Sequence, residues 1–196
     1  MRKFLTERRL NRLKKALIQR QFTLGVAIEN VHDPHNVSAI FRTCDAVGVP
    51  KVSLIYTIEK FPKISKATSA SAFKWVDKER FSSVSDCFDE YKKQGFKIYS
   101  SLLDENSVNL YDIDFTGKCL VVFGNESRGI SKEVIEQSDE TFYIPMRGMV
   151  QSLNVSVAAA VTLYEILRQR LLKGMYDETS LSEEEFEKLF DEWAER

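Results

Sequence analysis

The sequence predicts an α/β domain with a largely parallel sheet, and two observations support this fold class. Short apolar runs typical of buried strands recur along the chain, and stretches with helical periodicity lie between most of them. A chain of 196 residues, 43% of them hydrophobic, can build one such domain with short extensions.

The elements are expected in the following order. A helix over residues 5–20 comes first, because Leu10, Leu13 and Leu17 share one face. Apolar runs that predict strands lie at 24–28, 52–56, 96–103, 119–123 and 141–144. Helices are expected between strands at 36–47, 84–94 and 131–137, and Asn36 is a candidate N-cap for the first.

Two more helices are expected near the C-terminus. A long one spans 155–173 and is closed by Gly174. A capping box from Ser182 to Glu185 opens the second. Its apolar face is expected to dock on its own domain or on a partner subunit, and includes Phe186, Leu189, Phe190 and Trp193. The connection over 57–75 is long, and long connections often carry function.

Charge divides the chain into three parts. Residues 1–20 carry eight basic side chains and one acid, whereas residues 177–196 carry nine acids and two basic side chains. We therefore expect a basic N-terminal helical extension (1–22), a central domain (23–173) and an acidic amphipathic C-terminal helical extension (174–196). The basic arm suits a phosphate backbone, although a solvated amphipathic helix would carry the same charges.

Several classes of protein are disfavoured. The three cysteines lie far apart and no CxxC motif occurs, so neither a disulfide framework nor a zinc site is expected. His32 and His35 lie close together without two further ligands nearby, so no metal is expected. No apolar run approaches membrane-spanning length, which leads us to expect a soluble, cytoplasmic protein without membrane contact.

Polar loops follow three of the predicted strands, where ligands bind in open α/β sheets. The first is 29–36, which runs into a helix carrying Arg42 and Asp45; the other two are 123–131 and 144–156. Each has a plain structural alternative. Arg42 could form a surface ion pair with Asp45, and Glu126 could cap backbone amides. Ser152 or Asn154 could be no more than an N-cap.

The three loops resemble a known family. The stretches 36–48 (NVSAIFRTCDAVG), 123–131 (FGNESRGIS) and 144–157 (IPMRGMVQSLNVSV) are similar, in order, to motifs 1, 2 and 3 of the SpoU/TrmH family of SPOUT RNA 2′-O-methyltransferases. The likeness is strongest to the TrmH branch. It implies S-adenosylmethionine-dependent 2′-O-methylation of a ribose in tRNA, at guanosine 18 of the D loop. It also implies a homodimer and a deep C-terminal trefoil knot, against the general rarity of knots.

The resemblance also implies roles for particular residues. The positions that match the catalytic ones are Asn36, Arg42, Glu126, Ser152 and Asn154. The cofactor is expected to contact Ser101, Gly124, Glu126, Ile144 and Leu153. RNA is expected to lie over the dimer and to contact Arg8, Arg9, Arg12 and Lys15, with Arg168, Arg170 and Lys173 as further candidates.

The role of Arg42 has two versions. The family assigns it the activation of the ribose hydroxyl, yet an arginine side chain ordinarily keeps its proton at neutral pH. Arg42 is therefore either a base assisted by its surroundings or a charged group that holds phosphate and ribose.

Other functions stay open at this point. The same enzyme class could act on ribosomal RNA or on another tRNA nucleotide, and a non-catalytic RNA-binding protein could keep the fold. A nucleotide-dependent oxidoreductase or a kinase is remote, because neither GxGxxG nor a P-loop is present.

Overall fold

The centre of the computed structural model, which describes residues 5–63 and 72–196, is a seven-stranded sheet. The strand order is β3-β2-β1-β6-β4-β7-β5, and all six neighbouring pairs are parallel. The strands are β1 (Leu24–Glu29), β2 (Lys51–Ile55), β3 (Asp77–Phe81), β4 (Lys97–Ser101), β5 (Val108–Asn109), β6 (Cys119–Phe123) and β7 (Glu140–Tyr143).

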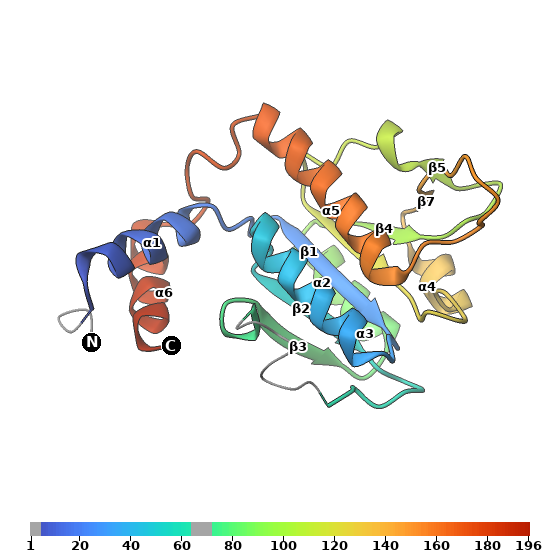
Figure 1. Cartoon of the computed structure of the whole chain (residues 1–196), viewed down its shortest axis with the longest axis horizontal. Coiled ribbons are helices and arrows are strands. Elements are labelled where there is room, and N and C mark those ends of the chain that lie inside the picture. The colour runs from blue at the N-terminus through green and yellow to red at the C-terminus, as the bar shows by residue number, and fades with distance from the viewer. Residues whose placement is uncertain (1–4, 64–71) are drawn as a thin grey trace.

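Helices cover both faces of this sheet and form a separate pair beside it (Figure 1). They are α1 (Glu7–Ile18), α2 (Pro34–Val47), α3 (Val84–Lys93), α4 (Lys132–Gln137), α5 (Val155–Leu172) and α6 (Glu183–Glu195), with short 3-10 turns at Ala72–Lys74 and Leu110–Asp112. Among the described residues, no helix combines the length and the apolar character that a bilayer crossing needs.

The sheet is the middle of three layers. Val26 and Val121 point to the face that α2 and α5 cover, and α2 and α5 pack against each other there. Ala27 and Leu120, one position along each strand, point to the other face, which α3 and α4 cover. This alternation follows from the two-residue period of a strand, and burial on both faces explains why β6 is apolar at every position.

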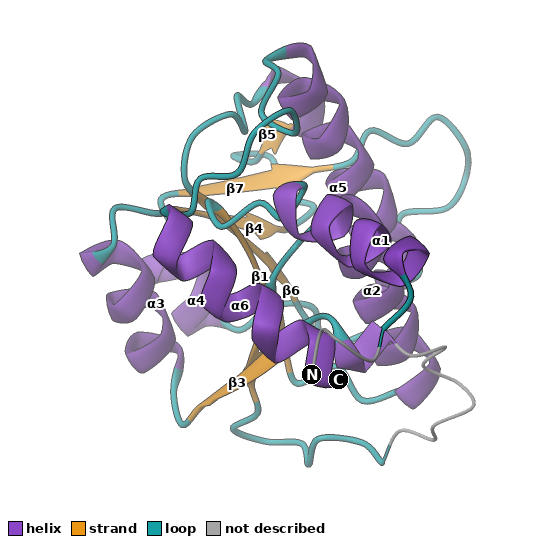
Figure 2. Ribbon diagram, turned by 90° about the vertical axis from the view of Figure 1, so that its left-hand side faces the viewer, coloured by secondary structure: helices purple, strands orange, loops and turns teal. Residues whose placement is uncertain are grey.

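The two ends of the chain meet in a helix pair. α1 packs on α6 beside the sheet (Figure 2), and a small core of Leu13, Leu17, Phe186, Phe190 and Trp193 lies between them. Ser182 and Glu185 form the predicted capping box at the start of α6. The apolar face of α6 therefore docks within its own chain, one of the two outcomes expected from the sequence.

Most predicted elements are confirmed within a few residues, and the differences have local causes. The N-cap of α2 is Asp33, whose carboxylate accepts from the His35 N–H at 2.7 Å, so the expectation of Asn36 as the N-cap was wrong. Two strands were not predicted: β3, a polar edge strand, and the two-residue β5. Of the predicted connection 57–75, residues 64–71 lie outside the described part.

Candidate active site

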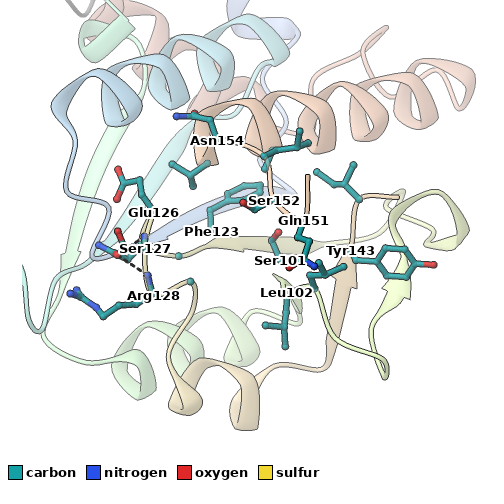
Figure 3. Close-up of a pocket in the computed structure, with 18 of the residues that line it drawn as sticks. Ser101, Leu102, Phe123, Glu126, Ser127, Arg128, Tyr143, Gln151, Ser152 and Asn154 are labelled. Atoms are coloured by element: carbon teal, nitrogen blue, oxygen red, sulfur yellow. Dashed lines mark hydrogen bonds between the residues drawn. The ribbon is translucent and has the colours of Figure 1, made fainter. Parts of the chain in front are cut away.

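A cavity of about 590 Å³ lies beyond the carboxyl ends of β4, β6 and β7. Three stretches far apart in the chain line it: residues 101–103, residues 123–129, and a set of residues between 143 and 158. In Figure 3, Ser101, Gln151 and Ser152 lie at its centre, while Glu126 and Asn154 lie toward one end and Tyr143 toward the other. Because all strands are parallel, their carboxyl ends meet at this edge, where α/β sheets bind ligands.

Glu126 ties the turn after β6 to the loop after β1. Its Oε2 accepts from the His32 N–H at 3.1 Å, and its Oε1 accepts from the Asp33 N–H at 3.1 Å. Desolvation acts to raise the pKa of Glu126, but hydrogen bonds from the Asn36 side chain and from backbone N–H groups outweigh it and lower that pKa. Glu126 is therefore ionised. It also caps backbone amides, which was one of the two roles expected for it from the sequence.

Asn36 extends this link to the third stretch. Its Nδ2 donates to Glu126 Oε1 at 3.0 Å, and its Oδ1 accepts from Asn154 Nδ2 at 3.0 Å. The Asn154 Oδ1 accepts from the Ser156 N–H at 2.8 Å and so caps α5. Two hydrogen bonds thus link Asn36 to Glu126, 90 positions away in the sequence, and to Asn154, 118 positions away.

The turn after β6 is tight and pre-formed. Asn125 and Gly129 exchange backbone hydrogen bonds of 2.9 and 2.8 Å, and the Asn125 Oδ1 accepts from the Ser127 and Arg128 N–H groups. A Cβ at Gly124 would lie 2.3 Å from the Gly129 carbonyl carbon and oxygen, so only glycine fits there. The backbone can therefore closely approach a ligand in the cavity.

The third stretch has backbone groups without partners. No residue in 146–153 hydrogen-bonds to another described residue. Met146, Gln151, Ser152 and Leu153 from this stretch line the cavity. A loop whose N–H and C=O groups are free can offer them to a bound molecule.

The structure brings most of the predicted site residues together. Ser101, Gly124, Glu126, Ile144 and Leu153, expected to bind the cofactor, all line the cavity. Ser152 and Asn154 line it as well, and Asn36 adjoins it through its hydrogen bonds. The roles of these residues toward a ligand stay predictions.

Arg42 lies apart from the cavity wall. It is exposed on α2, it does not line the cavity, and it makes no hydrogen bond or ion pair with a described residue. The alternative reading as an ion pair with Asp45 was wrong, because Asp45 binds Arg20. Without a partner in the described part of the chain, Arg42 can bind a group brought from outside.

The expected RNA-binding residues divide into exposed and buried ones. Arg8, Arg9, Arg12 and Lys15 are exposed on α1, and Lys173 is exposed after α5. Arg168 is exposed and pairs with Glu165 at 2.7 Å.

Arg170 contradicts its predicted role. Its side chain is 0% exposed, and its guanidinium donates to the carbonyl oxygens of Thr23, Phe115 and Gly117. It holds the end of α5 against the segments that precede β1 and β6 and is closed to RNA, so the prediction of an RNA contact was wrong.

Three residues that support the site were not predicted. Asn30 has φ 52°, and its Oδ1 accepts from three consecutive N–H groups of residues 57–59. Glu59 binds Arg128 at 2.9 Å, and Glu29 accepts from the Ser131 N–H at 2.8 Å. An asparagine directly after a strand suits the left-handed conformation, which is the signal that could have found Asn30.

Comparisons with known proteins agree with this architecture. The SpoU rRNA Methylase family matches residues 23–164. The tRNA (guanosine(18)-2'-O)-methyltransferase of Aquifex aeolicus is 44% identical over 194 residues, which are 99% of this chain and 92% of the relative. The crystal structure of an A. aeolicus TrmH/SpoU tRNA modifying enzyme has a TM-score of 0.90 at 44% identity and covers 96% of each chain.

A more distant structure adds a bound cofactor. The SpoU methyltransferase AviRb from Streptomyces viridochromogenes, in complex with AdoMet, is 25% identical with a TM-score of 0.69. That likeness covers 79% of this chain and 59% of the other. With a family match across most of its length and a relative at 44% identity, the chain belongs to the SpoU rRNA Methylase family.

Proposed function

We propose that this protein transfers a methyl group from S-adenosylmethionine to the ribose 2′-hydroxyl of guanosine 18 in tRNA. The observation that carries the proposal is the Glu126–Asn36–Asn154 chain, which joins all three motifs at one cavity. The A. aeolicus relative, whose match spans 99% of this chain, is named as a methyltransferase of guanosine 18 in tRNA. Because its substrate is tRNA, the proposal includes a cytoplasmic location.

The cavity fits S-adenosylmethionine by size and by chemistry. Its volume of about 590 Å³ lies within the range typical of small-molecule sites. The unpaired backbone groups of residues 146–153 can bind the edge of a purine, and the Glu126 carboxylate can offset a sulfonium charge. When bound, the cofactor supplies an electrophilic methyl group; Ser101, Gly124, Ile144 and Leu153 would hold it.

The residues of this chain contribute alignment and charge. In-line displacement requires the ribose oxygen, the methyl carbon and the sulfur to be collinear, and such alignment can lower a barrier by about 7–11 kcal/mol. The hydrogen bond between Asn36 and Asn154 fixes the third stretch against α2, which positions Ser152 at the cavity. Arg42 receives the phosphate and ribose of the target nucleotide, either as a charged clamp or as a base.

Arg42→Ala and Arg42→Lys test this role. Arg42 is exposed, so neither change is expected to unfold the protein. We expect Arg42→Ala to lose methyl transfer while it keeps cofactor affinity. Activity of Arg42→Lys that rises with pH favours the base, and a flat profile favours the clamp. Near-wild-type turnover by Arg42→Ala would overturn both versions.

The proposal includes a homodimer. Val157, Tyr164 and Leu171 recur every seven residues on α5, so they share one side of the helix, and they are 46%, 54% and 55% exposed. Met149 and Val150, in the third stretch, are 98% and 64% exposed. An apolar surface of this kind favours association, and a second copy would bring its own surface to Arg42, which has no partner within residues 5–63 and 72–196. Sedimentation should show a wild-type dimer and a Tyr164→Glu monomer; a monomeric wild type would refute this part.

The proposal also includes a C-terminal trefoil knot. β6 lies between β1 and β4, whereas β7 lies on the far side of β4, so the connection from β6 to β7 crosses β4. The chain then returns to α2, where Asn154 meets Asn36. A trefoil knot requires in addition that the returning segment passes through the loop that the earlier connection forms. A crystal structure whose backbone reduces to an unknotted path when the ends are joined would refute it.

Labelled methyl transfer to defined RNAs tests the whole function. We expect incorporation into a tRNA transcript, and no incorporation when nucleotide 18 carries a 2′-deoxyribose. A ribosomal RNA fragment as the preferred acceptor would overturn the assignment to tRNA. Calorimetric titration with S-adenosylmethionine separates an enzyme from a non-catalytic RNA-binding protein, because only the enzyme must bind the cofactor.

A further inference from the structure

A separate cleft of about 400 Å³ lies at the carboxyl ends of β2 and β3. Tyr56 and Phe61, from the segment after β2, line it together with Arg80 and Phe81 from the end of β3. It shares no lining residue with the cavity described above. Because the strands are all parallel, cleft and cavity nevertheless lie at the same edge of the sheet, toward which the arrowheads of β1 and β3 point in Figure 1.

The wall of the cleft combines aromatic rings with a stacked guanidinium. The Tyr56 and Phe61 rings meet edge to face, with their centroids 5.3 Å apart. The Arg80 guanidinium lies over the Phe61 ring, 5.4 Å from its centroid. Arg80 is exposed, so the side of its guanidinium that points away from the ring faces solvent. RNA-binding proteins stack unpaired bases on aromatic rings and on guanidinium planes of this kind.

The cleft also carries positive charge without a matching carboxylate. Lys60 and Arg80 line it, both are exposed, and neither forms an ion pair with another described residue. Glu59 lines it too, but its carboxylate already binds Arg128 at 2.9 Å and lies 3.6 Å from His32 Nδ1. Two such cations beside aromatic rings match a nucleotide, which offers a flat base and a negatively charged phosphate.

An ion pair and an asparagine hold the cleft in a fixed position relative to the cavity. Glu59 lines the cleft, and its partner Arg128 lines the cavity. The Asn30 Oδ1 accepts from the Glu59 N–H at 3.1 Å, and the Asn30 carbonyl oxygen accepts from Asn125 Nδ2 at 2.8 Å. Asn30 thereby fixes the segment after β2 to the turn after β6.

Tyr56 shows how close the two sites are. Its hydroxyl donates to the Val31 carbonyl oxygen at 2.7 Å, directly before the two N–H groups that Glu126 binds. Burial raises the pKa of Tyr56; the Glu126 carboxylate raises it further, and the Arg80 guanidinium acts to lower it. A charge from each site therefore acts on the same side chain.

The strand order gives the separation. β2 lies two strands from β6, whose carboxyl end carries the cavity, and β3 lies three strands from it. Neighbouring strands lie about 4.8 Å apart, so the cleft is roughly 10–15 Å from the cavity. One short stretch of RNA along this edge of the sheet can therefore reach both sites.

We propose that this cleft binds the base of a nucleotide close to the methylated ribose in the same RNA strand. The base stacks on the Phe61–Arg80 pair, and Lys60 binds the neighbouring phosphate. The proposal rests on the tRNA methyltransferase function above and adds a second point of contact within the target loop. A base held in the cleft cannot stack on its neighbours, so the strand stays open beside the ribose that enters the cavity.

Abasic nucleotides in the RNA test the proposal. Synthetic tRNAs each carry one abasic nucleotide, placed at successive positions on either side of nucleotide 18. Filter binding measures the affinity of the full-length protein for each tRNA. Loss of a stacked base should weaken binding by about 5- to 150-fold, and we expect such a loss at a position near nucleotide 18. Equal affinity for the intact tRNA and for every abasic tRNA would overturn the proposal.

Variants of the cleft assign the loss to particular side chains. Arg80→Gln removes the exposed guanidinium, and Phe61→Leu replaces the ring by an apolar side chain. We expect both variants to bind intact tRNA more weakly and to lose most of the difference between intact and abasic tRNA. Lys78→Gln is the matched control, because Lys78 is an exposed cation of the same strand that lies over the Phe73 ring, outside the cleft. It should keep the wild-type difference.

The comparison of variants also removes the effect of the abasic nucleotide on the tRNA itself, which is the same for every protein. Urea denaturation checks that Phe61→Leu is folded, and the exposed Arg80 provides the test without that concern. If Arg80→Gln weakens the binding of intact and abasic tRNA by the same factor, Arg80 binds phosphate rather than a base, and the proposal is refuted.

Failure of this proposal is distinguishable from failure of the proposed function. Methyl transfer by the wild type to intact tRNA is measured in parallel, and the binding data are interpreted independently of it. Absence of transfer would count against the function. Transfer by the wild type, together with cleft variants that keep the full difference between intact and abasic tRNA, would count against the cleft alone.

Discussion

Glu126→Gln separates the carboxylate from the shape of the side chain. In the wild type, Oε1 accepts two hydrogen bonds, from Asn36 Nδ2 and the Asp33 N–H, and Oε2 accepts one from the His32 N–H. Glutamine keeps one oxygen, which can retain the first two bonds. Its NH₂ group then faces the His32 N–H, where a donor meets a donor. The variant therefore loses one hydrogen bond and the negative charge.

The expected cost follows from this count. One hydrogen bond to a charged group contributes about 1.5–3 kcal/mol net to folding. His32 is exposed, so water can partly replace the lost acceptor and keeps the cost at the low end of that range, about 1.5 kcal/mol. For a chain of 196 residues this corresponds to a fall in Tm of roughly 3–6 °C.

The pH dependence has a definite sign. The folded-state pKa of Glu126 is lowered, so the carboxylate adds stability above its ordinary pKa and loses it as pH falls through the lowered one. The stability difference between wild type and Glu126→Gln should thus be full at neutral pH and shrink below about pH 4.

Urea denaturation at one protein concentration, at neutral and acid pH, measures this difference. Glu105→Gln is the matched control, because Glu105 is exposed and has no hydrogen bond or ion pair with a described residue. Calorimetry should also show weaker S-adenosylmethionine binding by Glu126→Gln alone. The reasoning is refuted if Glu126→Gln matches Glu105→Gln at neutral pH, or if the difference persists undiminished in acid.

Three further predictions concern other parts of the structure. Asn36→Ala and Asn154→Ala each break the hydrogen-bonded link between motifs and should slow methyl transfer about 10-fold. The double variant should be little slower than either single variant, because both belong to one link. Multiplicative losses in initial-rate assays would argue against one shared link. Gly124→Ala drives a Cβ against Gly129 and should cost about 1–3 kcal/mol of stability and weaken cofactor binding, so unchanged calorimetry would contradict the tight-turn argument. Arg170→Leu leaves buried carbonyl oxygens unpaired and should lower the free energy of unfolding, measured in urea, by about 3–5 kcal/mol. Filter binding of tRNA to the folded variant should stay normal. A selective loss of tRNA affinity would restore the predicted RNA-binding role of Arg170.

The central sheet could be predicted because its strands are buried on both faces. The run at 119–123 is apolar at every position and coincides with β6. β3 escaped prediction because it is a half-exposed edge strand with the sequence DKERF, which has no apolar alternation. Local patterns reveal strands only where burial constrains the side chains.

The site was partly predictable for a different reason. The motif resemblance indicated Asn36, Glu126 and Asn154, but their hydrogen bonds span about a hundred residues, and no local pattern encodes such pairing. Arg170 shows the opposite failure. A basic residue in the last turn of a helix ordinarily lies in solvent, and only the carbonyl oxygens of distant loops make its burial favourable.

The pairing of α1 with α6 has a consequence for biosynthesis. Leu13 and Leu17 find their buried aromatic partners on α6, at Phe186, Phe190 and Trp193, which are synthesised more than 160 residues later. Until α6 has been synthesised, the nascent chain carries a basic helix whose leucine face lacks most of its aromatic cover. A product truncated before α6 would therefore keep the whole sheet but expose the apolar face of a cationic helix, and chaperones and proteases recognise such exposed apolar surfaces.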